Sequence, residues 1–289
     1  MANYDIRQLQ LRLLDILQVI HEMCEKHGLR YYLLDGSLLG AVRHGGFIPW
    51  DDDMDIGMPR EDYEALIAHS KEWLPEPYEF VCFENDDKYP LHFGKIQDAS
   101  TTLIERLHLY YLGGIYVDVF PIDGAPDCKL TQRLYQMKYN YLRKALYFLF
   151  RDPYRHGHGP SSWIPLMARK LYTLPGLQKK IKRHMVKYDF NSHRLAAVNH
   201  NDGLKSMVDC KAVLGNPTPI LFEGKTVWGM KDNDAYLTQL FGDYMTPPPP
   251  DKIHQHNFDF MDLNLPYREF DESKIRHDKK NRIINHRTK

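Results

Sequence analysis

The sequence has few cysteines, and their spacing is not typical of a metal site or a redox pair. Only four occur in 289 residues: Cys24, Cys82, Cys128 and Cys210. No two of them lie two to four residues apart, as zinc and redox motifs require. We therefore expect buried, reduced thiols, as in a cytosolic protein.

Long apolar runs are also missing. No stretch approaches the ~20 apolar residues that a membrane-spanning helix needs, and the N-terminus does not have the pattern of a signal peptide. Apolar residues make up 43% and charged residues 26% of the chain, which is ordinary for a soluble globular protein of one large domain or two. The active part is therefore expected on the cytoplasmic side, either free or bound peripherally at the inner face of the membrane.

The chain as a whole has no excess charge of either sign, but its segments do. Residues 1–128 contain 10 Lys/Arg and 23 Asp/Glu, whereas residues 129–190 contain 14 Lys/Arg and only 2 Asp/Glu. Such asymmetry indicates different partners for the two segments. The acidic part suits a metal. The basic part, in which Tyr and Trp alternate with cations, suits a packed helical core, an anionic membrane surface or, least well, nucleic acid, for which no binding motif is present.

Four carboxylates within five residues are the strongest functional signal. Asp51, Asp52, Asp53 and Asp55 follow the apolar segment 47–50. Alternate residues of a strand point to one side, so Asp53 and Asp55 are expected to share a face. Carboxylate oxygens are the ligands that Mg²⁺ and Mn²⁺ prefer. A solvated acidic loop is the alternative, although such a loop does not need the apolar anchor.

A turn of small residues precedes these acids. Gly36 and Ser37 follow the apolar run 29–34 and are expected to offer backbone and hydroxyl donors to phosphate oxygens. Arg43 and Lys95 are candidate phosphate partners, with surface salt bridges as the alternative for each. Asp118 lies in a strand-like run, where a lone Asp usually faces solvent. Asp123 is expected in a turn beside Pro121 and Gly124.

The run from Gly36 to Ile56 resembles the signature of the LicD family of bacterial phosphotransferases, which are related to the fukutins. Segments 93–98, 115–123 and 236–250 also resemble parts of this family. The resemblance implies an α/β fold, with a nucleotidyltransferase-like core that has a short mixed sheet and carries a helical insertion. It implies that Asp118 is the third carboxylate beside Asp53 and Asp55. It also suggests that His256 contacts substrate.

Hydrophobic periodicity and turn residues predict the elements. Helices are expected at 5–27, 60–73, 130–150, 163–172, 177–188 and 233–241. Strands are expected at 29–34, 54–58, 80–83, 91–96, 102–107, 115–120, 208–214 and 226–230. We expect a catalytic core at 1–128, a basic and aromatic helical insertion at 129–200, a C-terminal segment returning to the core at 201–270, and a basic tail at 271–289.

The combined interpretation is a metal-dependent phosphotransferase. The resemblance implies a CDP-alcohol donor such as CDP-choline and, as acceptor, a sugar hydroxyl of a cell-surface glycan or lipid-linked precursor, in modification of teichoic acid or lipopolysaccharide. Asp53, Asp55 and Asp118 would hold Mg²⁺ or Mn²⁺. Two alternatives stay open: a nucleotidyltransferase that releases diphosphate, and a peripheral membrane or scaffold protein with a structural cation.

Overall fold

The computed structural model describes residues 4–109, 111–154, 158–249, 251, 253, 255 and 258–271. Its helices are α1 (Ile6–His27), α2 (Asp35–His44), α3 (Arg60–Trp73), α4 (Lys129–Phe150), α5 (Pro160–Leu171), α6 (Leu174–Met185) and α7 (Asn233–Phe241). Its strands are β1 (Tyr32–Leu33), β2 (Asp55–Pro59), β3 (Tyr78–Val81), β4 (Gly94–Ile104), β5 (Gly113–Ala125), β6 (Leu195–Ala197), β7 (Met207–Asp209), β8 (Thr218–Phe222), β9 (Lys225–Gly229) and β10 (Phe260–Asp262).

The sequence explains where α1 begins and ends. The Asp5 side chain accepts hydrogen bonds from the amides of Arg7 and Gln8, which satisfies donors that the first turn leaves unpaired. The helix ends at Gly28, whose φ of 67° is a left-handed conformation that glycine adopts without steric cost. Its apolar side is buried against the sheet, with Leu9, Leu13, Ile16, Leu17 and Ile20 in the main core.

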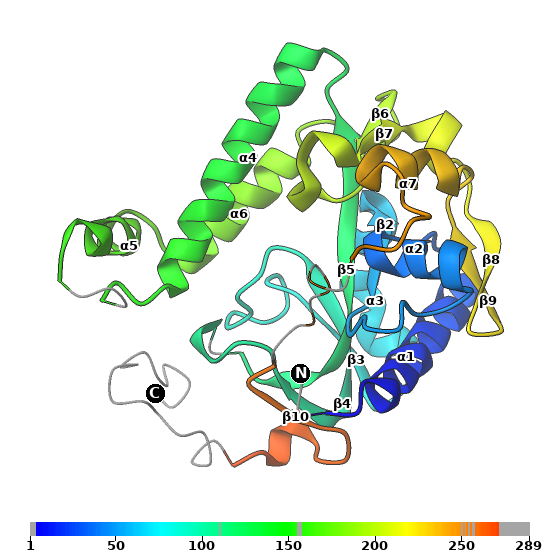
Figure 1. Ribbon diagram of the computed structural model, residues 1–289. Helices are drawn as coiled ribbons and strands as arrows, with labels where there is room; N and C mark the ends of the chain where they lie inside the picture. Colours follow the sequence, from blue (N-terminus) through cyan, green and yellow to red (C-terminus); the bar gives the residue numbers. More distant parts are fainter. Residues whose placement is uncertain are drawn as a thin grey trace.

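A mixed sheet organises the molecule around β5. Strand β5 pairs in parallel with β2 and antiparallel with β4, and its last residues pair with β6. Strands β3 and β10 extend the sheet beyond β4, while β1 pairs with β2. Figure 1 shows α1, α2 and α3 on one side of β5, and α4, α5 and α6 projecting from the other. The expected mixed α/β class with a helical insertion is therefore observed.

Several local expectations were wrong. Gly36 and Ser37 lie in the first turn of α2 rather than in a loop. The two strands expected at 91–96 and 102–107 are one strand, β4, with a register shift between Asp98 and Leu103. The strand expected at 208–214 ends at Asp209 and continues as a π-helical turn, Cys210–Leu214.

The cysteines agree only in part with the expectation of buried thiols. No disulfide is present, but only Cys24 and Cys82 are buried, whereas Cys128 is exposed and Cys210 is half-buried.

Within the described ranges, no helix is both long and apolar enough to cross a membrane. Helices α4 and α6 pack on each other around a small second core that contains Tyr139, Leu142, Leu146, Leu177 and Ile181.

Asp123 corrects another expectation, because it is a buried member of β5 and not a turn residue. Arg60 binds it through two hydrogen bonds, Nε to Oδ1 at 2.8 Å and Nη2 to Oδ2 at 2.7 Å. The Nε2 atom of His200 lies 3.0 Å from Oδ2. Burial disfavours the charged carboxylate, but the charge and hydrogen bonds of Arg60 outweigh it and lower the pKa of Asp123 to about 2. This cluster joins α3, β5 and the segment after β6.

We expect Asp123→Asn to lower the free energy of unfolding by about 3 kcal/mol, because it leaves the buried Arg60 charge without its partner. A lowered pKa means that wild-type stability from this pair is complete above about pH 4 and is lost as the pH falls toward 2. Urea unfolding between pH 2 and 7 measures both effects. Asp127→Asn is the control, because Asp127 is 55% exposed and its change should stay within about 0.5 kcal/mol.

Candidate active site

Three neighbouring strands place Asp55, Asp118 and Lys95 in one row across the sheet. Asp55 is paired with Asp118 in the parallel β2–β5 ladder, and Asp118 is paired with Lys95 in the antiparallel β4–β5 ladder. Residues that lie opposite each other in a ladder project from the same face. The sheet therefore gathers two of the predicted carboxylates and one predicted cation from sequence positions up to 63 residues apart.

The backbone of Asp55 is held on both sides. Its amide donates to Ser37 Oγ at 2.9 Å, and its carbonyl accepts from the amide of Leu34 at 3.0 Å. Ser37 therefore positions Asp55, while its hydroxyl proton remains a donor. Burial raises the pKa of the Asp55 carboxyl well above its ordinary value, and the charges of Asp53 and Asp118 raise it further. Each negative charge in this group makes ionisation of the others less favourable, and a cation bound between the carboxylates would offset this repulsion.

Asp118 is a half-buried acid with one incompletely satisfied oxygen. Lys95 Nζ lies 3.4 Å from Oδ1 as an ion pair, yet Oδ1 is buried without a hydrogen-bond donor among the residues the structure describes. Burial raises the pKa of Asp118 to about 7, although the charge of Lys95 opposes the shift. The group is therefore poised between its acid and base forms near neutral pH, which suits proton transfer.

Lys95 is a buried cation whose charge is shared by two acids. Its Nζ lies 3.0 Å from Glu105 Oε2 and 3.1 Å from the centroid of the Tyr116 ring. Glu105 also accepts from the Tyr116 hydroxyl at 2.8 Å. Burial would raise the pKa of Glu105, but Lys95 outweighs it and lowers the value to about 2. Sequence reasoning missed Glu105, because it lies just beyond the end of β4 and the register shift inside this strand breaks the alternation that could have related it to Lys95.

Asp35 is a second residue that sequence reasoning missed. Its φ of 44° is unusual for a residue other than glycine. Its carboxylate accepts from the Tyr236 hydroxyl at 2.6 Å and from Asn199 Nδ2 at 2.8 Å. Burial raises its pKa despite these two hydrogen bonds, and the charge of Asp53 adds to the rise. Asp35 therefore ties the start of α2 to residues 164 and 201 positions away, beside the acidic cluster.

The acids before β2 form the tightest carboxylate group. Among the described residues, Asp51, Asp52 and Asp53 are the one set of three possible ligands whose donor atoms all lie within 4.8 Å of one another. Asp53, Asp55 and Asp118 do not form so tight a group. Tyr4 donates its hydroxyl proton to Asp52, and a Cβ on Gly36 would stand 3.0 Å from Asp51 Oδ2. A side chain at position 36 would therefore press on the cluster.

These residues fit a hard divalent cation. The donor set consists of carboxylate oxygens, the electrostatic cost of bringing them together is high, and Asp118 Oδ1 is buried without a hydrogen-bond donor in the described part of the chain. Asp55 and Asp118 are neighbours on β2 and β5, and Ser37 in the first turn of α2 binds the backbone of Asp55. Helix α2 has no side-chain cap, and the dipole at its N-terminus favours an anion nearby.

The other predicted contacts have mixed outcomes. Arg43 lies in the last turn of α2, where its Nη1 donates to the carbonyl of Tyr244 at 2.7 Å. This position is about 12 Å along the helix from Asp35. Arg43 thus joins α2 to the C-terminal segment, and a phosphate contact by it stays a prediction. His256 lies outside the described residues.

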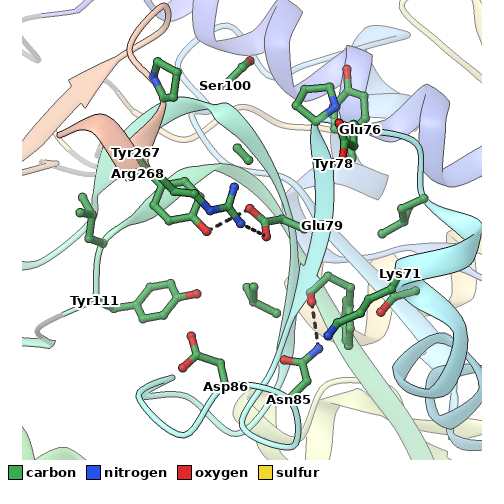
Figure 2. Close-up of a pocket in the computed structure, with 18 of the residues that line it drawn as sticks. Lys71, Glu76, Tyr78, Glu79, Asn85, Asp86, Ser100, Tyr111, Tyr267 and Arg268 are labelled. Carbon is green, nitrogen blue, oxygen red and sulfur yellow. Dashed lines mark hydrogen bonds and ion pairs between the residues drawn. The ribbon is translucent and has the colours of Figure 1, made fainter. Parts of the chain in front are cut away.

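A pocket of about 470 Å³ opens beside Asp118, a size typical of ligand sites. Lys95 and Glu105 line it from the sheet side, and Arg143 and Lys144 line it from α4. A larger pocket of about 870 Å³ lies around β3, where Figure 2 shows Glu79 bound by Arg268 and Tyr267. Asp118 lines the smaller pocket and not this one, so the smaller pocket is the better candidate for catalysis.

Comparison with known proteins agrees with this geometry. Residues 28–151 match a family described as LicD/FKTN/FKRP, nucleotidyltransferase domain. The lipopolysaccharide cholinephosphotransferase LicD of Haemophilus influenzae is 27% identical over 265 residues, which cover 89% of this chain and 97% of that protein. The human ribitol 5-phosphate transferase FKRP is 60% identical over 38 residues, 13% of this chain and 8% of that protein. Residues 28–151 are therefore similar to a LicD-family nucleotidyltransferase domain, and the relatives named here are transferases of phosphorus-containing groups.

Proposed function

We propose that this chain transfers a phospho-alcohol group, such as phosphocholine, from a CDP-activated donor to a sugar hydroxyl of a cell-surface glycan or its precursor, on the cytoplasmic side. The observation that carries the proposal is the row of Asp55, Asp118 and Lys95, which ends at a pocket with cations on its far wall. Acids on one side and cations on the other suit a metal-bound diphosphate. The relatives named for cholinephosphate and ribitol 5-phosphate transfer support this donor class.

Asp53, Asp55 and Asp118 are the residues we assign to Mg²⁺ or Mn²⁺. Such an ion supplies charge neutralisation at the phosphate oxygens. Lys95 keeps Asp118 oriented, and the first turn of α2 offers amide and hydroxyl donors at Gly36 and Ser37. The sheet and α2 thus fix the donor side of the site, and catalysis comes mainly from positioning and electrostatics.

The reaction forms one bond and breaks one. The acceptor oxygen attacks the phosphorus that carries the alcohol, and the bond from that phosphorus to the bridging oxygen of the diphosphate breaks, so CMP leaves. The hydroxyl proton goes to an oxygen of the Asp118 carboxylate, which then releases it to water. Asp118 lines the pocket in which the acceptor would be placed.

Product identification tests the proposal. The purified protein is incubated with Mn²⁺, a glycan acceptor and either CDP-choline or CDP-ribitol, and the released nucleotide is measured by chromatography. We expect CMP and a phospho-alcohol on the glycan. Release of diphosphate from a nucleoside triphosphate, without CMP from any CDP-alcohol, would indicate a nucleotidyltransferase instead. Metal-dependent stabilisation without turnover of any donor would indicate a structural cation site.

Arg143 gives a prediction about the pocket. It lies in α4, its Nη1 donates to Asn201 Oδ1 at 3.3 Å, and it lines the pocket with Asp118. We expect Arg143→Ala to raise the KM for the CDP-alcohol about 10- to 100-fold with a smaller change in kcat, because a charged hydrogen bond to phosphate contributes about 1.5–3 kcal/mol. Initial rates with a soluble acceptor measure this effect. Lys138→Ala, on the solvent side of the same helix, is the control; equal KM changes in both variants would contradict the assignment.

A further inference from the structure

Helices α4 and α5 expose rows of large apolar side chains. On α4, Leu130, Leu134, Met137 and Tyr141 follow one another at intervals of three or four residues, and each is between 57% and 67% exposed. On α5, the exposed residues are Trp163, Ile164, Leu166, Met167 and Leu171. Spacings of three or four place the α4 residues on one side of the helix, and Trp163, Met167 and Leu171 of α5 follow one another at intervals of four. Water-exposed apolar rows of this extent mark an interaction surface rather than ordinary surface.

The two rows belong to one surface, which we call the arm surface. Tyr141 and Tyr172, which follows α5, are joined by a 2.7 Å hydrogen bond between their hydroxyls. The Arg169 side chain donates to the carbonyls of Leu149 and Arg151 at the end of α4. Figure 1 shows α4 and α6 side by side, with α5 beyond the end of α4 and away from the sheet. The arm surface is thus the part of the described molecule that projects farthest from the catalytic sheet in this view.

The charges around the arm surface have a single sign. Helix α4 contains five Lys or Arg residues, α5 contains two and α6 contains four, and none of the three contains Asp or Glu. A second copy packing its arm surface on the first would bring these like charges together, which disfavours a symmetric dimer through this face. An anionic surface would attract these cations, apart from Lys182, which is paired with Glu64 and Glu84, and Arg143, which lines the pocket. Trp and Tyr beside cations are also the residues typical of a membrane interface.

We propose that the arm surface docks on an anionic membrane, with the apolar rows of α4 and α5 at the level of the headgroups. The opposite side of α4 carries Arg143, Leu146, Tyr147 and Phe150, which line the pocket that contains Asp118. Docking therefore brings the pocket close to the lipid. This part of the inference rests on the proposed function, because a lipid-linked glycan acceptor would then enter the pocket directly from the membrane.

Vesicle binding without any donor tests the docking. Flotation with vesicles of equal parts phosphatidylglycerol and phosphatidylcholine, at about 0.1 M salt, should carry the protein, since each cation near an anionic surface strengthens binding about fivefold. Vesicles of phosphatidylcholine alone should carry far less. The double variant Met137→Gln/Met167→Gln should bind the anionic vesicles at least about tenfold more weakly. Trp163 fluorescence should shift to the blue on binding, and Trp163→Phe should remove the shift.

Leu221→Gln is the matched control, because Leu221 on β8 is 63% exposed but lies outside the arm. Its vesicle binding should stay within about twofold of wild type. Equal binding by the double variant and wild type, or complete release of wild type at about 0.5 M salt, would overturn the insertion of the apolar rows. A stable dimer that the double variant dissociates, with no vesicle binding, would make this face a protein interface. CMP release with a soluble acceptor, measured separately, distinguishes these failures from failure of the proposed function.

Discussion

Asp55→Asn is expected to abolish turnover while the fold survives. We expect a loss of at least about 1000-fold, since a ligand of a catalytic metal contributes several kcal/mol of transition-state stabilisation. Asp53→Ala should have the same effect. The structural reason is that Asp55 is paired with Asp118 across β2 and β5, so its carboxylate lies next to the third assigned ligand. CMP release with Mn²⁺ and a CDP-alcohol measures the loss.

Thermal melting without donor separates a catalytic defect from misfolding. The metal-free Asp55→Asn protein should melt at the wild-type temperature or above it, because the substitution removes a carboxyl whose ionisation burial and the neighbouring acids oppose. Added Mn²⁺ should raise the melting temperature of wild type and raise that of the variant much less. Asp87→Asn, an exposed acid of the loop before β4, should behave as wild type in both measurements. Full activity in soluble Asp55→Asn or Asp53→Ala would refute the two-carboxylate assignment.

Local sequence features predicted the helices of the core well. The bounds of α3 and α7 agree with expectation, because Pro59 and Gly242 mark one end of each and the apolar spacing covers the rest. Small residues favour turns, and for this reason the sequence predicts a turn at Gly36 and Ser37. They are helical because Leu38 and Ala41, farther along α2, pack into the main core, and this packing outweighs local preference.

The candidate site was predictable only in part. Strand alternation suggested Asp53 and Asp55 together, whereas Asp118 was joined to them by the family resemblance, and its pairing with Asp55 across β2 and β5 is a long-range contact. The hydrogen bonds of Asp35 to Asn199 and Tyr236, and the cluster of Asp123 with Arg60 and His200, join segments whose approach only the tertiary fold determines. For the same reason, no local pattern indicated that α4 would contribute Arg143 to the wall of the pocket beside Asp118.

Substitution of Asp118 is the second change for which we expect a large loss of turnover. We expect Asp118→Asn to lower turnover by at least ~100-fold, which is the lower end of what a positioned base or a metal ligand contributes. The fold should survive, because Lys95 keeps its 3.0 Å ion pair with Glu105 when the charge at position 118 is removed. The KM for the CDP-alcohol should change less than kcat, since Asp118 acts on the acceptor side of the site.

Glu105→Gln and Asp123→Asn make the test of Asp118 specific. Glu105→Gln leaves Lys95 paired with Asp118 alone. The variant should keep most of the turnover. Its pH profile of turnover should shift toward lower pH, because the full charge of Lys95 then favours the Asp118 carboxylate. Asp123→Asn, assayed where it remains folded, should keep its kcat, because its partners Arg60 and His200 do not line the pocket beside Asp118. If Asp118→Asn retained turnover while folded Asp123→Asn lost it, then Asp123 and not Asp118 would be the functional acid of β5, and the row across β2, β5 and β4 would be structural.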